Sequence, residues 1–133
     1  MRVKNVDHLN LSVRSFAESA EWYGRVFGFE VVEEGLYDGA PWGVLRSEDA
    51  MLCIYEHPDY GDVSKSGTGG RHGINHFGLR ISDRKAWEET VEREKITVMY
   101  DGEVHWPHSS SWYITDPTGY EIEVALWEDG PKF

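Results

Sequence analysis

A repeated motif is the feature that most constrains the fold of this chain. Residues 5–13 read NVDHLNLSV, and residues 73–82 read GINHFGLRIS. Each copy has a histidine, His8 or His76, flanked by hydrophobic residues at matching positions, at an offset of 68 residues (76 − 8 = 68). A repeat of about half the chain indicates a duplicated structural unit, so the sequence predicts two similar modules that bring two imidazoles together.

Both copies show the alternation of a strand with one buried face. Their hydrophobic residues alternate with polar or small ones, and are Leu9, Leu11 and Val13 in the first copy and Phe77, Leu79 and Ile81 in the second. Successive side chains of a strand point to opposite faces, which places His8 and His76 on the side away from the hydrophobic residues. If helices cover the hydrophobic side, both histidines face a cavity.

The same order of elements is predicted after each copy. Ser15 can cap a helix that Gly28 ends, and a second helix runs from about Asp83 to Glu94. Three strands follow each helix, at residues 29–33, 42–46 and 50–55 in the first half and 96–100, 111–115 and 120–127 in the second, with residues 101–107 as a loop. The sequence therefore predicts an α+β fold of two β-α-β-β-β modules.

The two modules are expected to form a single domain over residues 1–133. Module one covers about residues 1–56 and module two about 73–127, followed by a tail at 128–133. Between them, residues 57–72 are rich in glycine and serine without periodicity, which is typical of a linker. A phosphate-binding loop is the alternative, but the segment lacks the Gly-Lys-Ser/Thr ending and opens no helix.

Charge and cysteine content narrow the possible partners. The net charge of −11 argues against nucleic acid, since neutralising phosphates needs a basic surface. Acidity of this kind favours solubility, and a cationic ligand is the more specific interpretation. We expect no signal peptide or membrane span, and the single cysteine, Cys53, excludes an internal disulfide and mildly supports a reducing, cytoplasmic setting.

Glu123 completes a possible metal-binding set. Ile122 and Val124 alternate with Glu121 and Glu123, so Glu123 lies on the face opposite the hydrophobic one, as His8 and His76 do. Two neutral nitrogens and one carboxylate oxygen leave positions open on a divalent metal, and open positions are what a catalytic site needs. We therefore predict His8, His76 and Glu123 as metal ligands.

These features resemble the vicinal oxygen chelate superfamily, which includes glyoxalase I, extradiol dioxygenases, fosfomycin resistance proteins and bleomycin resistance proteins. The resemblance covers essentially the whole chain and is carried by VDHL around His8, INHF around His76, and DPTGYEIE ending at Glu123. It implies modules closed into a cup-shaped mixed sheet, with helices outside, around a divalent metal such as Fe, Mn, Zn, Ni or Co. It also implies a homodimer that binds a small-molecule substrate.

Members of the superfamily differ at a fourth position, in the strand that ends the first module. Aligning residues 52–54 with 122–124 puts Cys53 opposite Glu123, at an offset of 70. Glyoxalase I carries a carboxylate or amide there, so the thiol weighs against glyoxalase I itself. We interpret Cys53 as cavity lining. Cys53 or Glu56 as a further ligand are the alternatives, although Glu56 shares a face with the hydrophobic residues.

The extradiol dioxygenases provide the closest reaction pattern. His105, Tyr113, the Asp-Pro-Thr-Gly turn and Glu123 stand at matching intervals, with departures at Glu103 and Trp112. By this resemblance Tyr113 would hydrogen-bond a metal-bound substrate oxygen, and His105 would be an acid-base group. The tyrosine and the turn also occur in members that do not cleave rings, so His105 alone favours ring cleavage.

Three functions follow from these observations. A ring-cleaving dioxygenase leads, with a glyoxalase-like isomerase or lyase as the alternative. A third possibility is a bleomycin-resistance-type protein that sequesters a cationic drug between acidic grooves and aromatic walls, although retention of three ligands counts against it. Phosphonate binding, as in fosfomycin resistance proteins, lacks the expected basic residues at 104–111. The residues expected to line the pocket are Asn10, Met51, Cys53, Tyr55, Gly78 and Arg80.

Overall fold

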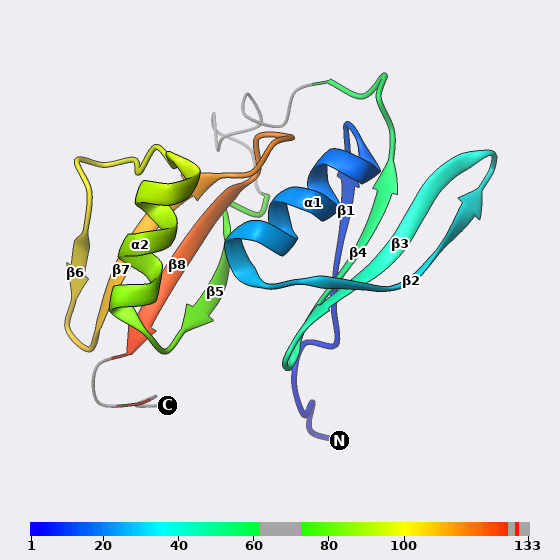
Figure 1. Cartoon of the computed structure of the whole chain (residues 1–133). Helices are drawn as coiled ribbons and strands as arrows, with labels where there is room; N and C mark the ends of the chain where they lie inside the picture. Colours follow the sequence, from blue (N-terminus) through cyan, green and yellow to red (C-terminus); the bar gives the residue numbers. More distant parts are fainter. Residues whose placement is uncertain (62–72, 128–129, 131–133) are drawn as a thin grey trace. The chain divides into compact units, whose positions relative to one another are not determined.

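The computed structural model describes residues 1–61, 73–127 and 130, in two compact units that cover Met1–Gly61 and Asp62–Phe133 (Figure 1). The first unit contains β1 (Leu9–Val13), α1 (Phe16–Phe27), β2 (Glu30–Tyr37), β3 (Ala40–Ser47) and β4 (Ala50–Glu56). The second contains β5 (Phe77–Ile81), α2 (Arg84–Glu94), β6 (Val104–Trp106), β7 (Ser109–Thr115) and β8 (Glu121–Trp127). The predicted β-α-β-β-β order is confirmed in both halves.

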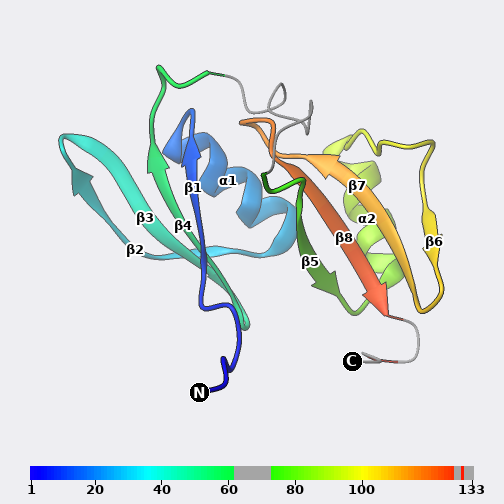
Figure 2. The same ribbon diagram turned by 180° about the vertical axis from the view of Figure 1, so that it is seen from behind.

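Each unit folds into its own four-stranded mixed sheet with the same connectivity. The strand orders are β1-β4-β3-β2 and β5-β8-β7-β6, and in each sheet the first strand pairs in parallel with the last (Figure 2). Asn10 pairs with Cys53 in the first sheet, and Gly78 pairs with Glu123 in the second. The two registers are therefore equivalent, and the alignment of Cys53 with Glu123 is confirmed.

Side-chain caps begin both helices, at the predicted cap Ser15 and at Asp83, near which the second helix was predicted to start. The Ser15 hydroxyl accepts a hydrogen bond from the Glu18 N–H at 3.3 Å, and the Asp83 carboxylate accepts one from the Ala86 N–H at 3.0 Å. Such caps satisfy backbone N–H groups that have no partner in the first helical turn. Gly28 ends α1 in the left-handed conformation, with φ 67°.

The hydrophobic side of each sheet packs under its own helix. Tyr23 of α1 is fully buried, and Trp87 of α2 lies against Trp112 of β7 with ring centroids 6.2 Å apart. The buried strand residues on this side are those that the alternation selects, including Leu11, Val13, Leu52 and Ile54 in the first unit and Ile114, Ile122 and Val124 in the second. Because one face of each sheet is covered in this way, the side chains of opposite parity are directed to the other face.

One strand of the second unit differs from the prediction. Residues 96–100 are not a strand, and β6 lies instead within the segment predicted as a loop. Three successive residues, Tyr100, Asp101 and Gly102, have φ values of 57°, 62° and 109°, which turn the chain before extended pairing can continue. The Met99 N–H still donates to the Tyr113 carbonyl at 2.8 Å, so the segment runs beside β7 without joining the sheet.

The predicted linker and tail fall largely outside the described residues, which exclude 62–72, 128–129 and 131–133. At the start of the predicted linker, the His57 N–H donates to the Val13 carbonyl at 2.8 Å. The closing of the modules into one cup and the single-domain boundaries stay predictions. Among the described residues, neither helix is long and apolar enough to cross a membrane.

Candidate functional site

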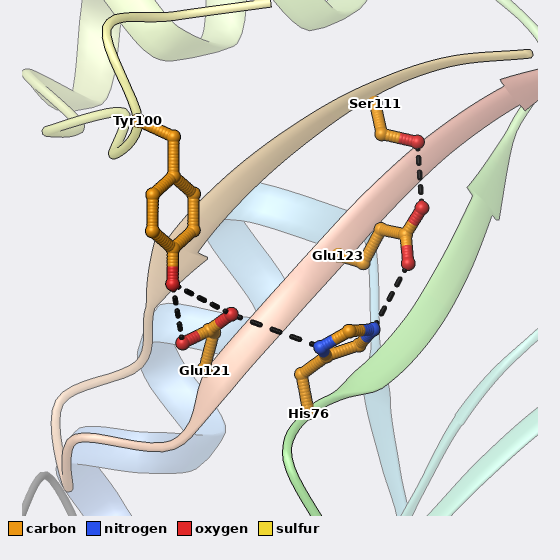
Figure 3. A network of polar contacts seen from close by, with 5 residues as sticks. All are labelled: His76, Tyr100, Ser111, Glu121 and Glu123. Atoms are coloured by element: carbon orange, nitrogen blue, oxygen red, sulfur yellow. Dashed lines mark hydrogen bonds and ion pairs between the residues drawn. The ribbon is translucent and has the colours of Figure 1, made fainter. Parts of the chain in front are cut away.

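His76 and Glu123 lie side by side in the second unit. His76 directly precedes β5 and Glu123 is the third residue of β8, and these two strands are parallel neighbours. The Nε2 atom of His76 is 3.0 Å from Oε2 of Glu123 (Figure 3). The structure therefore brings together two of the three predicted metal ligands, one nitrogen donor and one oxygen donor.

A buried serine holds the other carboxylate oxygen of Glu123. The Ser111 hydroxyl, on β7, donates to Oε1 of Glu123 at 2.6 Å (Figure 3), and Ser111 is fully buried. A short hydrogen bond to a carboxylate fixes its orientation. Sequence reasoning did not single out Ser111, although it shares strand parity with Tyr113.

Glu121 and Tyr100 extend the network on the other edge of the imidazole ring. Oε1 of Glu121 is 3.7 Å from Nδ1 of His76, and the Tyr100 hydroxyl donates to Glu121 at 3.2 Å (Figure 3). The negative charge of Glu121 is the main cause that raises the pKa of Tyr100. Glu121 had the parity of Glu123 but no predicted role, and Tyr100 was missed because its segment was predicted to be a strand.

Tyr113 joins this group as predicted. It pairs with Glu123 in the sheet, its ring centroid is 5.4 Å from that of His76, and it is 6% exposed. Burial is the main cause that raises the pKa of Tyr113, and the charge of Glu123 adds to it, while a hydrogen bond from Trp106 acts in the opposite direction. The phenol therefore stays protonated at neutral pH and remains a hydrogen-bond donor.

An open pocket of about 520 Å³ lies over these residues. Its walls include His76, Tyr100, Trp106, Tyr113 and Glu121. The side chains come from the segment before β5, from the turn at 100–102 and from β6, β7 and β8, so the second unit alone builds a concave site of the size that small ligands occupy.

His105 lies on the other face of the same sheet. It pairs with Ser110, which has the parity of Trp112 and so faces α2. Nδ1 of His105 is 3.6 Å from Oε1 of Glu103, and Arg84 of α2 binds the same carboxylate at 2.8 Å. The structure does not bring His105 together with Tyr113, because adjacent strand residues alternate between faces, and this placement argues against the acid-base role.

His8 lies in the first unit, directly before β1. Its Nδ1 is 2.8 Å from Oδ2 of Asp7, the kind of contact that directs Nε2 of a histidine toward a metal. Within the described residues, no group of three or more His, Cys, Asp or Glu side chains is arranged to hold a metal ion. The complete set of three ligands, which combines both units, stays a prediction.

The predicted pocket-lining residues of the first unit share one face of its sheet. Asn10 is exposed, and Met51, Cys53 and Tyr55 are half-buried between the buried residues of β4. Burial is the main cause that raises the pKa of the Cys53 thiol, and nearby acidic charges add to it. A neutral thiol agrees with the interpretation of Cys53 as lining.

Aromatic residues that sequence reasoning missed surround Tyr55. The Trp42 ring stacks on Tyr55 at 5.8 Å, and the Tyr37 ring meets it edge-on at 5.6 Å. The pairing of Trp42 with Tyr55 in the sheet is the reason for this contact. In the second unit, the guanidinium of Arg80 lies 5.3 Å from the Trp127 ring centroid, and Arg80 is exposed.

Glu56 has a structural partner. Its Oε2 accepts a hydrogen bond from the Phe16 N–H at 2.8 Å, at the first residue of α1. This places the carboxylate on the helix side of the first sheet, where it satisfies a backbone donor and complements the positive end of the helix. The contact favours a capping role over a role as a metal ligand.

The fold and these residues agree with a comparison against known families. The Glyoxalase/Bleomycin resistance protein/Dioxygenase superfamily matches residues 5–124. The chain belongs to this superfamily. The match confirms the vicinal oxygen chelate resemblance, and the superfamily contains both enzymes and binding proteins.

Solved structures of other proteins share the fold of this chain. A glyoxylase/bleomycin resistance protein/dioxygenase domain from Frankia sp. EAN1pec has a TM-score of 0.77 at 17% identity, with 98% of this chain and 96% of that chain covered. A lactoylglutathione lyase from Agrobacterium tumefaciens gives 0.66 at 23% identity (95% and 96%), and TnmS3, an antibiotic binding protein from Streptomyces sp. CB03234, gives 0.70 at 16% (96% and 99%). At these identities the likeness establishes the fold.

Proposed function

We propose that this chain is a metal-dependent enzyme that acts on a small substrate with two adjacent oxygen atoms. His8, His76 and Glu123 would hold the divalent metal. The observation that carries the proposal is the 3.0 Å approach of His76 Nε2 to Glu123 Oε2 on neighbouring strands. A nitrogen and a carboxylate oxygen that converge at this distance are two members of a 2-His-1-carboxylate set.

The surroundings of the two residues fit a metal centre. Ser111 orients the carboxylate of Glu123, and Glu121 faces the second ring nitrogen of His76. Groups of this kind orient metal ligands in proteins and fix the histidine tautomer. When bound, a divalent metal supplies Lewis-acid stabilisation of negative charge on the substrate oxygens.

Tyr113 is the protein group best placed to handle a proton or hydrogen bond in the reaction. It lies against His76 and remains protonated because its pKa is raised. A phenol in this state donates a hydrogen bond to an oxygen on which negative charge develops, and it contributes most when that charge is greatest. Its burial between Tyr100 and the sheet keeps the donor oriented before substrate arrives.

We favour an isomerase or lyase reaction over ring cleavage. His105 was the residue that distinguished ring cleavage, and it lies on the opposite face of the second sheet from Tyr113. The fold shared with a lactoylglutathione lyase supports the same choice, although Cys53, at the position equivalent to Glu123, indicates a substrate other than that of glyoxalase I. The predicted homodimer is part of this proposal, since a second subunit can complete the pocket.

The proposal is tested by metal analysis followed by turnover assays. We expect purified and reconstituted protein to hold a divalent metal and to convert a member of a ketoaldehyde panel without oxygen uptake. Tyr113→Phe should lower kcat by about 10²-fold, the scale of a lost proton-transfer group, and His105→Ala should leave it unchanged. Oxygen uptake with a catechol that His105→Ala abolishes would reverse our choice of reaction. Failure to take up metal would favour a sequestering protein.

A further inference from the structure

The pocket of the second unit is walled by aromatic rings that remain open to solvent. Trp106 is 52% exposed and Tyr100 is 61% exposed, although both line a concave site. The Tyr100 and Tyr113 rings meet edge-to-face, with centroids 5.2 Å apart and planes at 82°. Tyr113 is buried in this pair, so the ring surface available to a ligand is that of the exposed Tyr100 and Trp106.

A carboxylate lies among these rings. Glu121 has a side chain that is 27% exposed, and its polar contacts are with the Tyr100 hydroxyl and the His76 ring. Neither partner carries a permanent positive charge, and among the described residues that line the pocket none is lysine or arginine. Within this described part of the chain, the negative charge of Glu121 can therefore attract a cationic ligand.

Aromatic faces combined with a carboxylate select one chemical class of ligand. An organic cation over the face of a tryptophan or tyrosine is attracted by the negative face of the ring, and recognition of quaternary ammonium groups by several such rings is well established. Anionic ligands are disfavoured here, because they would place a second negative charge beside Glu121. A neutral ligand gains only the apolar contact.

We propose that this pocket binds an alkylammonium group and that the substrate of the enzyme is an amine that is protonated or quaternary. As a statement about the substrate, this inference rests on the proposed function. The imidazole of His76 connects the ammonium pocket with the proposed metal site, since its Nδ1 faces Glu121 and its Nε2 faces Glu123. The ammonium group and the adjacent oxygens of the substrate then lie on either side of His76.

The test compares two probes of the same shape in metal-free full-length protein. Choline carries a trimethylammonium group, and 3,3-dimethyl-1-butanol replaces its nitrogen by carbon. By calorimetry we expect choline to bind at least about tenfold more tightly, which is the factor that a desolvated cation–π and carboxylate site supports. Glu121→Gln should weaken choline binding about tenfold, and Trp106→Leu should weaken it to a similar extent.

A matched control separates local charge from the net charge of the chain. Glu89→Gln removes one carboxylate from the exposed surface of α2, where Glu89 is 63% exposed, and choline affinity should not change. Equal binding of choline and 3,3-dimethyl-1-butanol to wild-type protein would overturn the inference. This comparison needs no variant, so it holds even if a substituted protein fails to fold. Unchanged choline affinity in a folded Glu121→Gln protein would also overturn the inference.

The metal titration separates this inference from the proposed function. If metal binds but choline is not preferred, the substrate class is wrong and the metal site stands. If choline is preferred but no metal binds, the ammonium pocket stands and the enzymatic proposal fails.

Discussion

The two units of this chain share a backbone plan and differ in the side chains on their polar faces. The pairing of Asn10 with Cys53 in the first sheet is equivalent to that of Gly78 with Glu123 in the second. A thiol therefore occupies the position of a carboxylate in an otherwise matching register. The buried residues that alternate along each strand fix the register of the sheet. The side chains on the polar face do not fix it, so they can differ between the two units.

The two histidines show the same contrast. His8 has a carboxylate partner that is its own neighbour in sequence, Asp7, and the two side chains are 42% and 80% exposed. His76 lies between Glu121 and Glu123, which belong to another strand and are mostly shielded. The first unit thus offers a single imidazole, and the second holds a network that orients its donors. This contrast predicts where substitutions should have large and small effects.

The largest difference is expected between Glu123→Gln and Cys53→Ser, the two equivalent positions. Loss of the carboxylate should weaken metal binding by at least about 100-fold, since even partners of ligands cost 10–100-fold when removed. Cys53→Ser should leave metal affinity within about threefold, because a neutral side chain with a raised thiol pKa is a poor ligand. Metal titration of chelator-treated protein measures both. A comparable loss in both variants would show that Cys53 is a ligand.

Core truncations in the two units should have similar effects on stability. Leu52 is 1% exposed and Ile122 is fully buried, and they occupy equivalent positions on β4 and β8. Each change to alanine should lower the free energy of unfolding by about 2–5 kcal/mol, as cavities in tightly packed cores do. Urea denaturation checks this, with the exposed Leu36→Ala as the control. A negligible cost in one unit would contradict the equivalence of the two cores.

Most of the fold was predictable because local and global signals agree. Hydrophobic patterns identified seven of the eight strands in the described residues, and Ser15 and Gly28 marked the ends of α1 through caps that need specific residues. The prediction of a strand at 96–100 was wrong, because the segment has the hydrophobic pattern of a strand but its backbone turns at 100–102. Tyr100 and Asp101 take left-handed conformations there, which no residue pattern in the segment revealed.

The site was less predictable, because it depends on tertiary contacts. Parity along β5 and β8 was enough to bring His76 and Glu123 to one face. Ser111 needed the register of β7 against β8, and the error in the β6 segment hid the true face of His105. Spacing matched His105 to a catalytic pattern, but spacing alone does not determine the face of a strand.

Smaller effects are expected at the helix caps, which the two units build differently. The first turn of α1 is held by Ser15 and by Glu56, whereas α2 is capped by Asp83. Asp83→Ala should cost about 1 kcal/mol, and Ser15→Ala should cost less because Glu56 still accepts from the Phe16 N–H. Chemical denaturation of the two variants decides the order. A larger cost for Ser15→Ala would show that Glu56 contributes little.

The smallest effects are shifts in titration, measured in metal-free protein. Glu121→Gln should lower the pKa of Tyr100, since the charge of Glu121 is its main cause of elevation. Glu33→Gln should lower the pKa of Cys53 by less, because burial is the main cause there. A raised native pKa means that stabilisation is present below the ordinary pKa and is lost as pH rises through the raised value. Phenolate absorbance measures the pKa of Tyr100 and thiolate absorbance that of Cys53. A larger pKa change for Cys53 than for Tyr100 would contradict the prediction.

The central claim is that one histidine from each module and one carboxylate bind the same metal ion. Its most direct test is a cobalt(II) titration of metal-free protein, with His8→Gln compared against His76→Gln. We predict one ion per chain, and a loss of at least about tenfold in affinity for each variant, because the two imidazoles serve as equivalent ligands. Cobalt affinity that His76→Gln reduces and His8→Gln leaves unchanged would contradict the claim.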